Sequence, residues 1–359
     1  MIHKKILLLY LWSNLNFFKI RRLLERFGNQ DLDKKIDEVY NYANIDQKQD
    51  VILGAYNIDY NMIKDRMKVF IDQDFPDYLF ESDCGLVFYK GNWDFTDRKY
   101  IRVSIVGSRK PLNISSEFVS KLLFYLSDIS NIVVVSGLAT GIDTIALEQA
   151  INNNIGATAI LGNGIDYYYP YHNKVLQTNL FKNGLVFSEY PPNHPPRKYY
   201  FPYRNRLIAA MSDVVVVVQA SEKSGSIITG KYALEMGKTL IVPYLSNTED
   251  FEGSKQLINS GAILISKPQE ILNYLPLNFL KSNTKSHMQN LQKTQNYQEY
   301  QDEIIKIVRL NPGITLEKIA QITEINLPEL IKIVTELELQ GKLQLEFDYS
   351  LFVIDKNID

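Results

Sequence analysis

The sequence is poor in the residues that bind metals and form cross-links. Its 359 residues include one cysteine, Cys84, and four histidines that lie far apart: His3, His172, His194 and His287. A single thiol excludes an internal disulfide and a cysteine-based zinc site. The scattered histidines suggest no metal cluster. We therefore expect a cytoplasmic protein that holds no metal ion.

Neither charge of one sign nor a long apolar run dominates the chain. The net charge of −2 and the hydrophobic fraction of 45% are typical of globular proteins. They do not point to a nucleic-acid binder, although a local basic patch can coexist with acidic regions. The apolar run from Ile6 to Trp12 follows a basic start, as in a signal peptide. It is short, lacks a small-residue cleavage site and cannot cross a bilayer, so we expect an amphipathic first helix and no membrane contact.

The first 72 residues show helical spacing. Leu7, Leu8, Leu11 and Leu15 recur at intervals that place them on one side of a helix. We predict a small helical domain of the SAM or helix-hairpin-helix type over residues 1–72. A DNA-clamping hairpin needs a glycine–apolar–glycine turn, and Gly28 stands alone, which disfavours DNA binding by this domain.

A different pattern governs residues 76–275, where short β-branched runs alternate with segments of helical periodicity. The runs occupy 103–106, 132–135, 157–161, 185–187, 214–218, 239–242 and 262–265. Nearly continuous apolar strands between helices are typical of a parallel sheet that is covered on both faces. The predicted fold class is α/β, a Rossmann-like doubly wound parallel sheet.

The C-terminal part begins with a polar stretch at 281–298, which we predict to be a linker. Residues 299–356 show three helical segments followed by an alternating hairpin, the pattern of a winged helix. Between 299 and 359 there are twelve acidic and six basic residues, and the presumed recognition helix carries Glu329, Glu336 and Glu338 against Lys332. Phosphates would repel such a face, so we expect a protein-interaction or regulatory module.

Small and basic residues follow four of the predicted strands. They are Gly107-Ser108-Arg109-Lys110, the turn from Gly137 to Gly141, Gly162-Asn163-Gly164, and the turn from Gln219 to Gly230. The carboxyl ends of parallel strands meet at one edge, where ligands bind. Two of these turns open helices, whose free N–H groups attract anions. The sequence therefore predicts an anion-binding crevice, although each glycine by itself would also suit a tight turn.

The sequence lacks residues that known catalytic motifs require. The spacing from Gly225 to Lys231 fits a phosphate-binding P-loop, but Tyr232 stands where a Ser or Thr would hold magnesium. The chain has neither a dinucleotide-binding glycine motif after its first strand nor a G-x-S-x-G nucleophile turn. We expect no cofactor and no catalytic residue.

Basic and aromatic residues interleave in the segment before the strand at 214–218. The basic residues there and after the strands are Arg109, Lys110, Lys174, Arg197, Lys198, Arg204 and Arg206, and the aromatics are Tyr199, Tyr200, Phe201 and Tyr203. Cations that follow phosphates and aromatics that stack on unpaired bases make a single-strand groove. The alternative is that the aromatics pack in the core. Pro195, Pro196 and Pro202 favour a loop over a core strand.

Several motifs in order resemble one family. They are IVGSRKP at 105–111, VVSGLATGIDTIAL at 134–147, LGNGIDYYYPYHNK at 161–174, SEYPP at 188–192, FPYRNRLIAAMS at 201–212, SGSIITGKYALEMGKTLIVP at 224–243 and GSKQLINSGA at 253–262. They are similar to the DNA-processing protein A family (DprA, also called Smf). The resemblance implies a homodimer that binds single-stranded DNA and loads the RecA recombinase onto it during natural transformation, without catalysis.

From the resemblance and the strand ends together we predict the DNA-binding residues. They are Gly107, Ser108, Arg109, Lys110, Gly137, Asn163, Asn173, Lys174, Lys198, Phe201, Arg204, Asn205, Arg206, Ser224, Gly225, Ser226 and Thr229. The chain departs from the family pattern at Gln219, at Tyr244 and at 112–114. These departures remove no basic residue of the predicted groove.

Two other functions remain open on the sequence alone. A Rossmann-like nucleotide hydrolase, similar to the nucleoside-monophosphate phosphoribohydrolases, would use Thr229 and Glu235, but the doubled-glycine turn of those enzymes is missing. A transcription regulator built on the winged helix is disfavoured by its acidic recognition helix.

Overall fold

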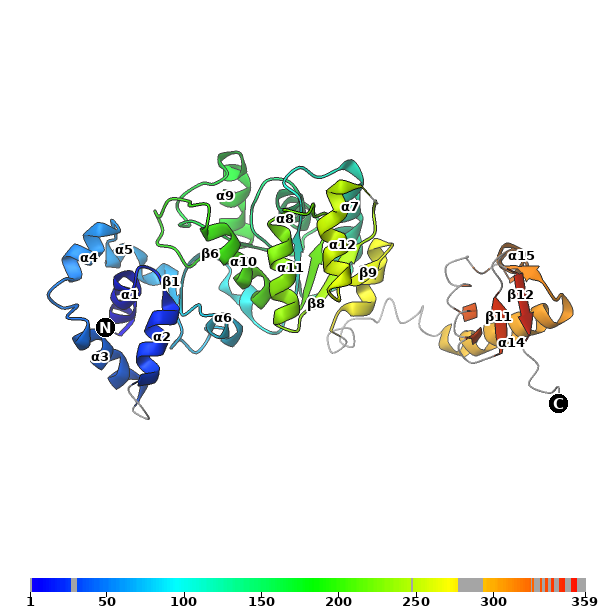
Figure 1. Cartoon of the computed structure of the whole chain (residues 1–359), viewed down its shortest axis with the longest axis horizontal. Coiled ribbons are helices and arrows are strands. Elements are labelled where there is room, and N and C mark those ends of the chain that lie inside the picture. Colours follow the sequence, from blue (N-terminus) through cyan, green and yellow to red (C-terminus); the bar gives the residue numbers. More distant parts are fainter. Residues whose placement is uncertain are drawn as a thin grey trace. The chain divides into compact units, whose positions relative to one another are not determined.

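The computed structural model describes residues 2–26, 31–246, 248–276, 293–323, 325, 330, 333–334, 337–338, 342–345 and 350–353. The chain divides into two compact units, Met1–Leu280 and Lys281–Asp359. Each unit is described by itself (Figure 1). No helix in the described part of the chain is long and apolar enough to cross a membrane.

The first unit begins with a group of helices. They are α1 (Ile2–Trp12), α2 (Phe17–Arg26), α3 (Leu32–Tyr42), α4 (Gln49–Ala55) and the short α5 (Tyr60–Ile63). Every residue of α1 from Ile6 to Leu11 is at most 1% exposed. Helix α1 contacts α2, α3, α4 and strand β2 (Leu86–Gly91), so it is enclosed on all sides and is not the one-sided amphipathic helix that we expected.

A nine-stranded sheet follows, in the order β1-β2-β6-β5-β4-β3-β7-β8-β9. The parallel strands are β3 (Ile101–Val106), β4 (Ile132–Ser136), β5 (Gly156–Ile160), β6 (Leu185–Ser188), β7 (Val214–Val217), β8 (Thr239–Pro243) and β9 (Ile263–Ile265). These strands match the seven predicted runs within two residues. Strands β1 (Met67–Val69) and β2, which the sequence analysis missed, extend one edge in antiparallel fashion.

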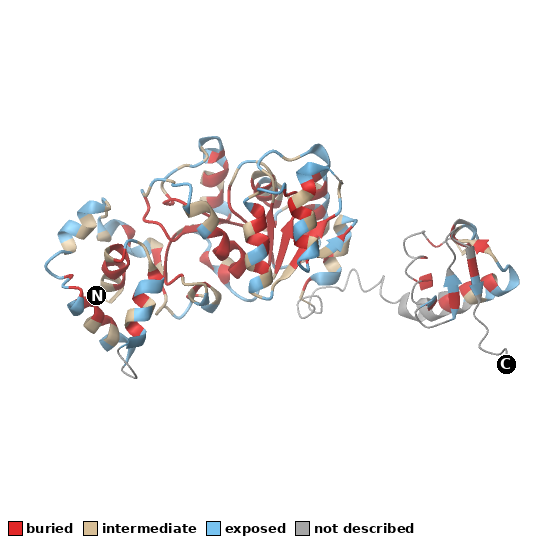
Figure 2. Ribbon diagram, in the orientation of Figure 1, coloured by how far each residue is buried: buried red, intermediate tan, exposed pale blue. Residues whose placement is uncertain are grey.

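Strands β3 to β8 are buried on both faces (Figure 2). In β7, Val214 and Val216 belong to one core cluster, and Val215 and Val217 belong to the other. The first cluster is shared with α1, α7 (Asn113–Ser127), α8 (Ile142–Asn152) and α9 (Lys174–Asn183). The second is shared with α6 (Asp77–Glu81), α10 (Tyr200–Met211), α11 (Ser226–Glu235) and α12 (Glu252–Asn259). This alternation is the doubly wound arrangement that the sequence predicted.

The topology places a crevice in the middle of the sheet. After β3 the chain adds β4, β5 and β6 on one side and then returns to add β7 on the other side of β3. The turns that leave β3 and β7 therefore diverge. In an open α/β sheet this switch point is where ligands bind.

The second unit has its own small core. Helix α14 (Lys293–Leu310) extends back into the predicted linker, and α15 (Leu316–Thr323) follows it. An antiparallel sheet pairs β10 (Ile314–Thr315) and β11 (Leu343–Leu345) with β12 (Ser350–Val353) between them. Most of the predicted third helix, with Glu329 and Glu336, and residues 281–292 of the linker lie outside the described residues. The winged helix stays a prediction.

Candidate nucleic-acid interface

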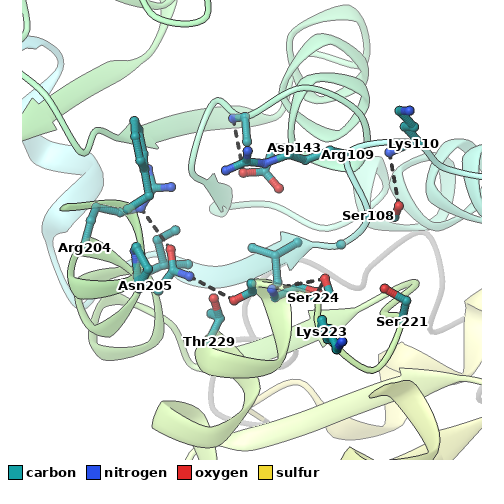
Figure 3. A pocket seen from close by; sticks show the side chains of 18 of the residues that line it. Ser108, Arg109, Lys110, Asp143, Arg204, Asn205, Ser221, Lys223, Ser224 and Thr229 are labelled. Atoms are coloured by element: carbon teal, nitrogen blue, oxygen red, sulfur yellow. Dashed lines mark hydrogen bonds between the residues drawn. The ribbon is translucent and has the colours of Figure 1, made fainter. Parts of the chain in front are cut away.

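An open cavity of about 610 Å³ lies at the switch point of the sheet (Figure 3). The turns after β3 and β7, the start of α10 and the start of α11 surround it. Twelve of the predicted site residues line it: Gly107, Ser108, Arg109, Lys110, Lys198, Phe201, Arg204, Asn205, Ser224, Gly225, Ser226 and Thr229. The structure thus brings together residues that are up to 122 positions apart in the chain, from 107 to 229.

Exposed cations surround this cavity. Arg109, Lys110, Lys198 and Lys223 all line it and are exposed to solvent. None of the four has an ion-pair partner among the described residues. Lys223 was not among the predicted residues, although its place in the turn after β7 could have indicated it. Unpaired cations around an open cavity are available to bind phosphates.

The start of α11 adds hydrogen-bonding groups to the same wall. The side-chain oxygens of Ser224 and Ser226 lie 2.7 Å apart, and Asn205 Nδ2 donates to the Gly225 carbonyl at 3.2 Å. A helix N-terminus carries partial positive charge, which favours an anion there. The turn after β7 is tied to the residue before α7 by Gln219, whose Oε1 accepts the Leu112 N–H at 2.9 Å.

A second, smaller cavity of about 40 Å³ continues from the first. Both cavities share Arg109, Ala139 and Phe201, and the second also includes Thr140 and Tyr169. Beyond it, the exposed Lys174 lies over the rings of Tyr168 and Tyr171, at 5.1 and 5.7 Å from their centroids. Tyr169 is a further residue that the site prediction did not include.

The turn from Gly137 to Gly141 is held by buried polar side chains. Asp143 Oδ2 accepts the N–H groups of Gly137 and Ala139 at 3.0 and 3.3 Å. Arg204 donates to the Gly137 carbonyl at 2.8 Å and also to the Ile160 carbonyl. Burial raises the pKa of the Asp143 carboxyl, while the Arg204 charge opposes that rise.

Two predicted DNA contacts are therefore supports of this turn. Arg204 is 4% exposed, and burial lowers the pKa of its guanidinium to about 10 despite the nearby Asp143 charge. Asn173 is 3% exposed, and its Nδ2 donates to the Leu138 carbonyl at 3.0 Å. Asn163 is likewise buried, and its Nδ2 donates to the Tyr167 carbonyl at 2.8 Å. The hydrogen-bonding groups of these side chains are used within the protein.

Arg206 lies outside both cavities, which corrects its predicted place in the groove. Its guanidinium donates to both carboxylate oxygens of Glu189, at 2.6 and 2.8 Å, and stacks on the Tyr203 ring at 3.9 Å. Burial would lower its pKa, but the Glu189 charge and hydrogen bonds outweigh burial and raise it. We expected a loop here. Instead Pro202 sits in the first turn of α10, where no N–H is needed, and successive positions turn by about 100°, so Arg204 and Arg206 diverge.

Comparisons with known proteins show the family of this chain. Residues 66–276 match the family model for DNA recombination-mediator protein A. The DNA processing protein DprA of Streptococcus pneumoniae is 37% identical over 213 residues, which are 56% of this chain and 74% of that protein. The DprA protein of Bacillus subtilis is 34% identical over 193 residues, which are 54% of this chain and 64% of that protein.

Two solved structures of DNA processing protein A are similar to this chain. The X-ray structure of DprA from Streptococcus pneumoniae covers 76% of this chain and 93% of its own, with a TM-score of 0.57 and 31% identity. A structure described as showing the single-stranded DNA binding mode of the Helicobacter pylori protein covers 58% of this chain and 94% of its own, with a TM-score of 0.52 and 30% identity.

Proposed function

Since the chain belongs to the DNA recombination-mediator protein A family, we propose that it is a single-stranded DNA-binding recombination mediator. The supporting observation is that four exposed cations, which have no ion-pair partner among the described residues, line an open cavity together with Phe201 and the start of α11. Exposed cations bind phosphates, and aromatic residues at the cavity provide a surface on which an unpaired base stacks. A duplex keeps its bases stacked inside, so the aromatic contact favours a single strand.

The finer proposal concerns the role of the bound protein. In it the chain is a homodimer in the cytoplasm that loads RecA onto single-stranded DNA taken up in natural transformation. The relatives named DNA processing protein support this role. It is tested by RecA-dependent strand exchange with and without the chain, and by sedimentation of the purified protein.

Catalysis is not part of the proposal. Asp143, a carboxylate that lines the first cavity, is engaged by backbone N–H groups. Glu235, which a nucleotide hydrolase would pair with Thr229, is exposed and is not among the described residues that line the cavity.

The decisive experiment is a binding titration of a labelled dT oligomer and a matching duplex over a salt series. Each phosphate contact on a single strand contributes about 0.7 to the slope of log K against log salt, so the four cations of the cavity together contribute about −3 to the slope. The double variant Arg109→Ala/Lys198→Ala should reduce the slope by about 1.4. The variant Lys121→Ala/Lys182→Ala removes two lysines that line neither cavity and should leave it unchanged. Equal affinity for both nucleic acids, or no salt slope, would overturn the proposal.

A further inference from the structure

An exposed tyrosine lies next to Phe201. The ring centroids of Tyr169 and Phe201 are 5.3 Å apart and the rings are inclined by 29°, a stacked arrangement. Tyr169 is nevertheless 42% exposed, and it lines the second cavity together with Arg109. The aromatic surface that begins at Phe201 therefore continues outward, beside a cation that belongs to both cavities.

The ring of Phe201 packs against the backbone at Gly162. An added Cβ at Gly162 would lie 2.8 Å from Phe201 Cδ1, so the ring packs directly against that backbone. With Gly162 on one side and Tyr169 stacked on the ring, the position of Phe201 is fixed. Tyr169 is the exposed member of the pair, whereas Phe201 is only partly exposed.

The loop that carries Tyr169 is also fixed. Asn163 holds the Tyr167 carbonyl, and the Asp166 N–H donates to the Pro192 carbonyl at 2.8 Å. The Asp166 carboxylate accepts hydrogen bonds from Lys90 and Arg66. A rigid aromatic that is held open in advance loses little freedom when a ligand stacks on it.

We propose that Tyr169 is a base-stacking platform for the strand segment that passes between Arg109 and Lys174, with Phe201 as the support beneath it. The inference rests on the proposed single-strand binding and specifies how Tyr169 contributes to that binding. Any of the four bases would suit the site, because each has a face that stacks on an aromatic ring. Lys174, held over Tyr168 and Tyr171, would meet the phosphate on the far side of the base.

The test compares Tyr169→Ala and Tyr169→Phe with a control from the same loop, Tyr167→Ala. Tyr167 is 41% exposed, like Tyr169, but lines neither cavity. Loss of one stacked base should weaken binding of a dT oligomer by about 10- to 100-fold in Tyr169→Ala. The salt slope should stay the same, because no phosphate contact is removed. Tyr169→Phe and Tyr167→Ala should bind like the parent protein.

A second measurement identifies the base itself. A single abasic site is moved along the dT oligomer, and binding is measured for the parent protein and for Tyr169→Ala. At one position the parent should lose affinity while the variant is indifferent, because only the parent has a ring there.

The outcomes separate this inference from the proposed function. Equal or tighter binding by Tyr169→Ala overturns the platform, and tighter binding would mean that Tyr169 is a cover over Phe201. A reduced salt slope in that variant also overturns it. If the parent protein shows no salt-dependent preference for the single strand, the proposed function fails and the platform fails with it.

Discussion

The buried pair of Arg206 and Glu189 gives the sharpest prediction about the site. The sequence places Arg206 in the DNA groove, whereas in the structure its side chain is 7% exposed and that of Glu189 is 4% exposed. Replacing Arg206 by Met leaves the Glu189 carboxylate buried without a partner. Removing one member of a buried ion pair costs about 3–5 kcal/mol of unfolding free energy. We expect that loss in Arg206→Met.

The double variant Arg206→Met/Glu189→Met is the matched control. Replacing both charged groups by apolar ones of similar size is often neutral for stability. Here one cost already exists in the native protein, because Arg206 Nε is buried without a hydrogen-bond partner. The double variant should therefore recover most of the stability that Arg206→Met loses.

The measurement is urea unfolding of the full chain followed by tryptophan fluorescence. The two tryptophans, Trp12 and Trp93, both belong to the first unit, so the signal reports that unit alone. The folded double variant should also keep the parent's salt slope for single-stranded DNA. A slope reduced by about 0.7 with unchanged stability in Arg206→Met would refute the reasoning and return Arg206 to the groove.

Other substitutions test the supports, the charges and the second unit. Gly162→Ala should displace Phe201 and weaken single-strand binding, whereas Gly54→Ala, with nothing within 4 Å of the added Cβ, should bind normally. Burial and the Arg197 charge lower the pKa of His194 from its ordinary 6.5, so the unfolded chain takes up the proton first. The free energy of unfolding should then decrease as the pH drops through that value. In His194→Gln this decrease should be smaller, measured by the same fluorescence assay. Removing residues 299–359 should leave the salt slope intact, and a collapse of binding would show that the second unit contacts DNA.

The parallel strands could be predicted because most of them are apolar runs buried on both faces, and four of them are followed by small residues. Strands β1 and β2 could not, because Met67–Val69 is three residues long and Leu86–Gly91 turns polar at Lys90. Strand β1 pairs with β2, and β2 pairs with β6, so both depend on distant partners for their conformation. Local sequence patterns do not contain those long-range partners.

The same limit applies to the site. Arg109, Lys110 and Lys198 were predicted from the strand ends, the basic and aromatic segment and the family resemblance, and all three line the cavity. The sequence could not distinguish these three residues from Arg206. The direction of the Arg206 side chain depends on the phase of α10 and on Glu189, which is 17 positions away. The prolines before α10 suggested a loop, and a loop has no helical phase. Once Tyr200–Met211 is a helix, residues two apart must point in different directions.

Exposed cations and buried supporting residues affect binding in different ways. Exposed cations such as Arg109 act through counterion release, so their loss changes the salt slope. Buried supports such as Arg204 and Asn173 act by shaping the turn from Gly137 to Gly141, so their loss should weaken affinity at every salt concentration with the slope retained. A salt series thus assigns each residue of the site to one class, which affinity at one salt concentration cannot do.

The overall charge of the chain hides this basic site. Residues 299–359 carry −6, so the remaining residues carry +4 although the whole chain is at −2. The field that a phosphate meets is local, since the Debye length is about 8 Å at physiological salt. The cavity is lined by the four exposed cations and by two carboxylates, Asp143 and Asp250, so positive charge is in excess there although the whole chain is slightly acidic. A slightly acidic chain binds a polyanion when its positive charges are gathered, exposed and left without partners.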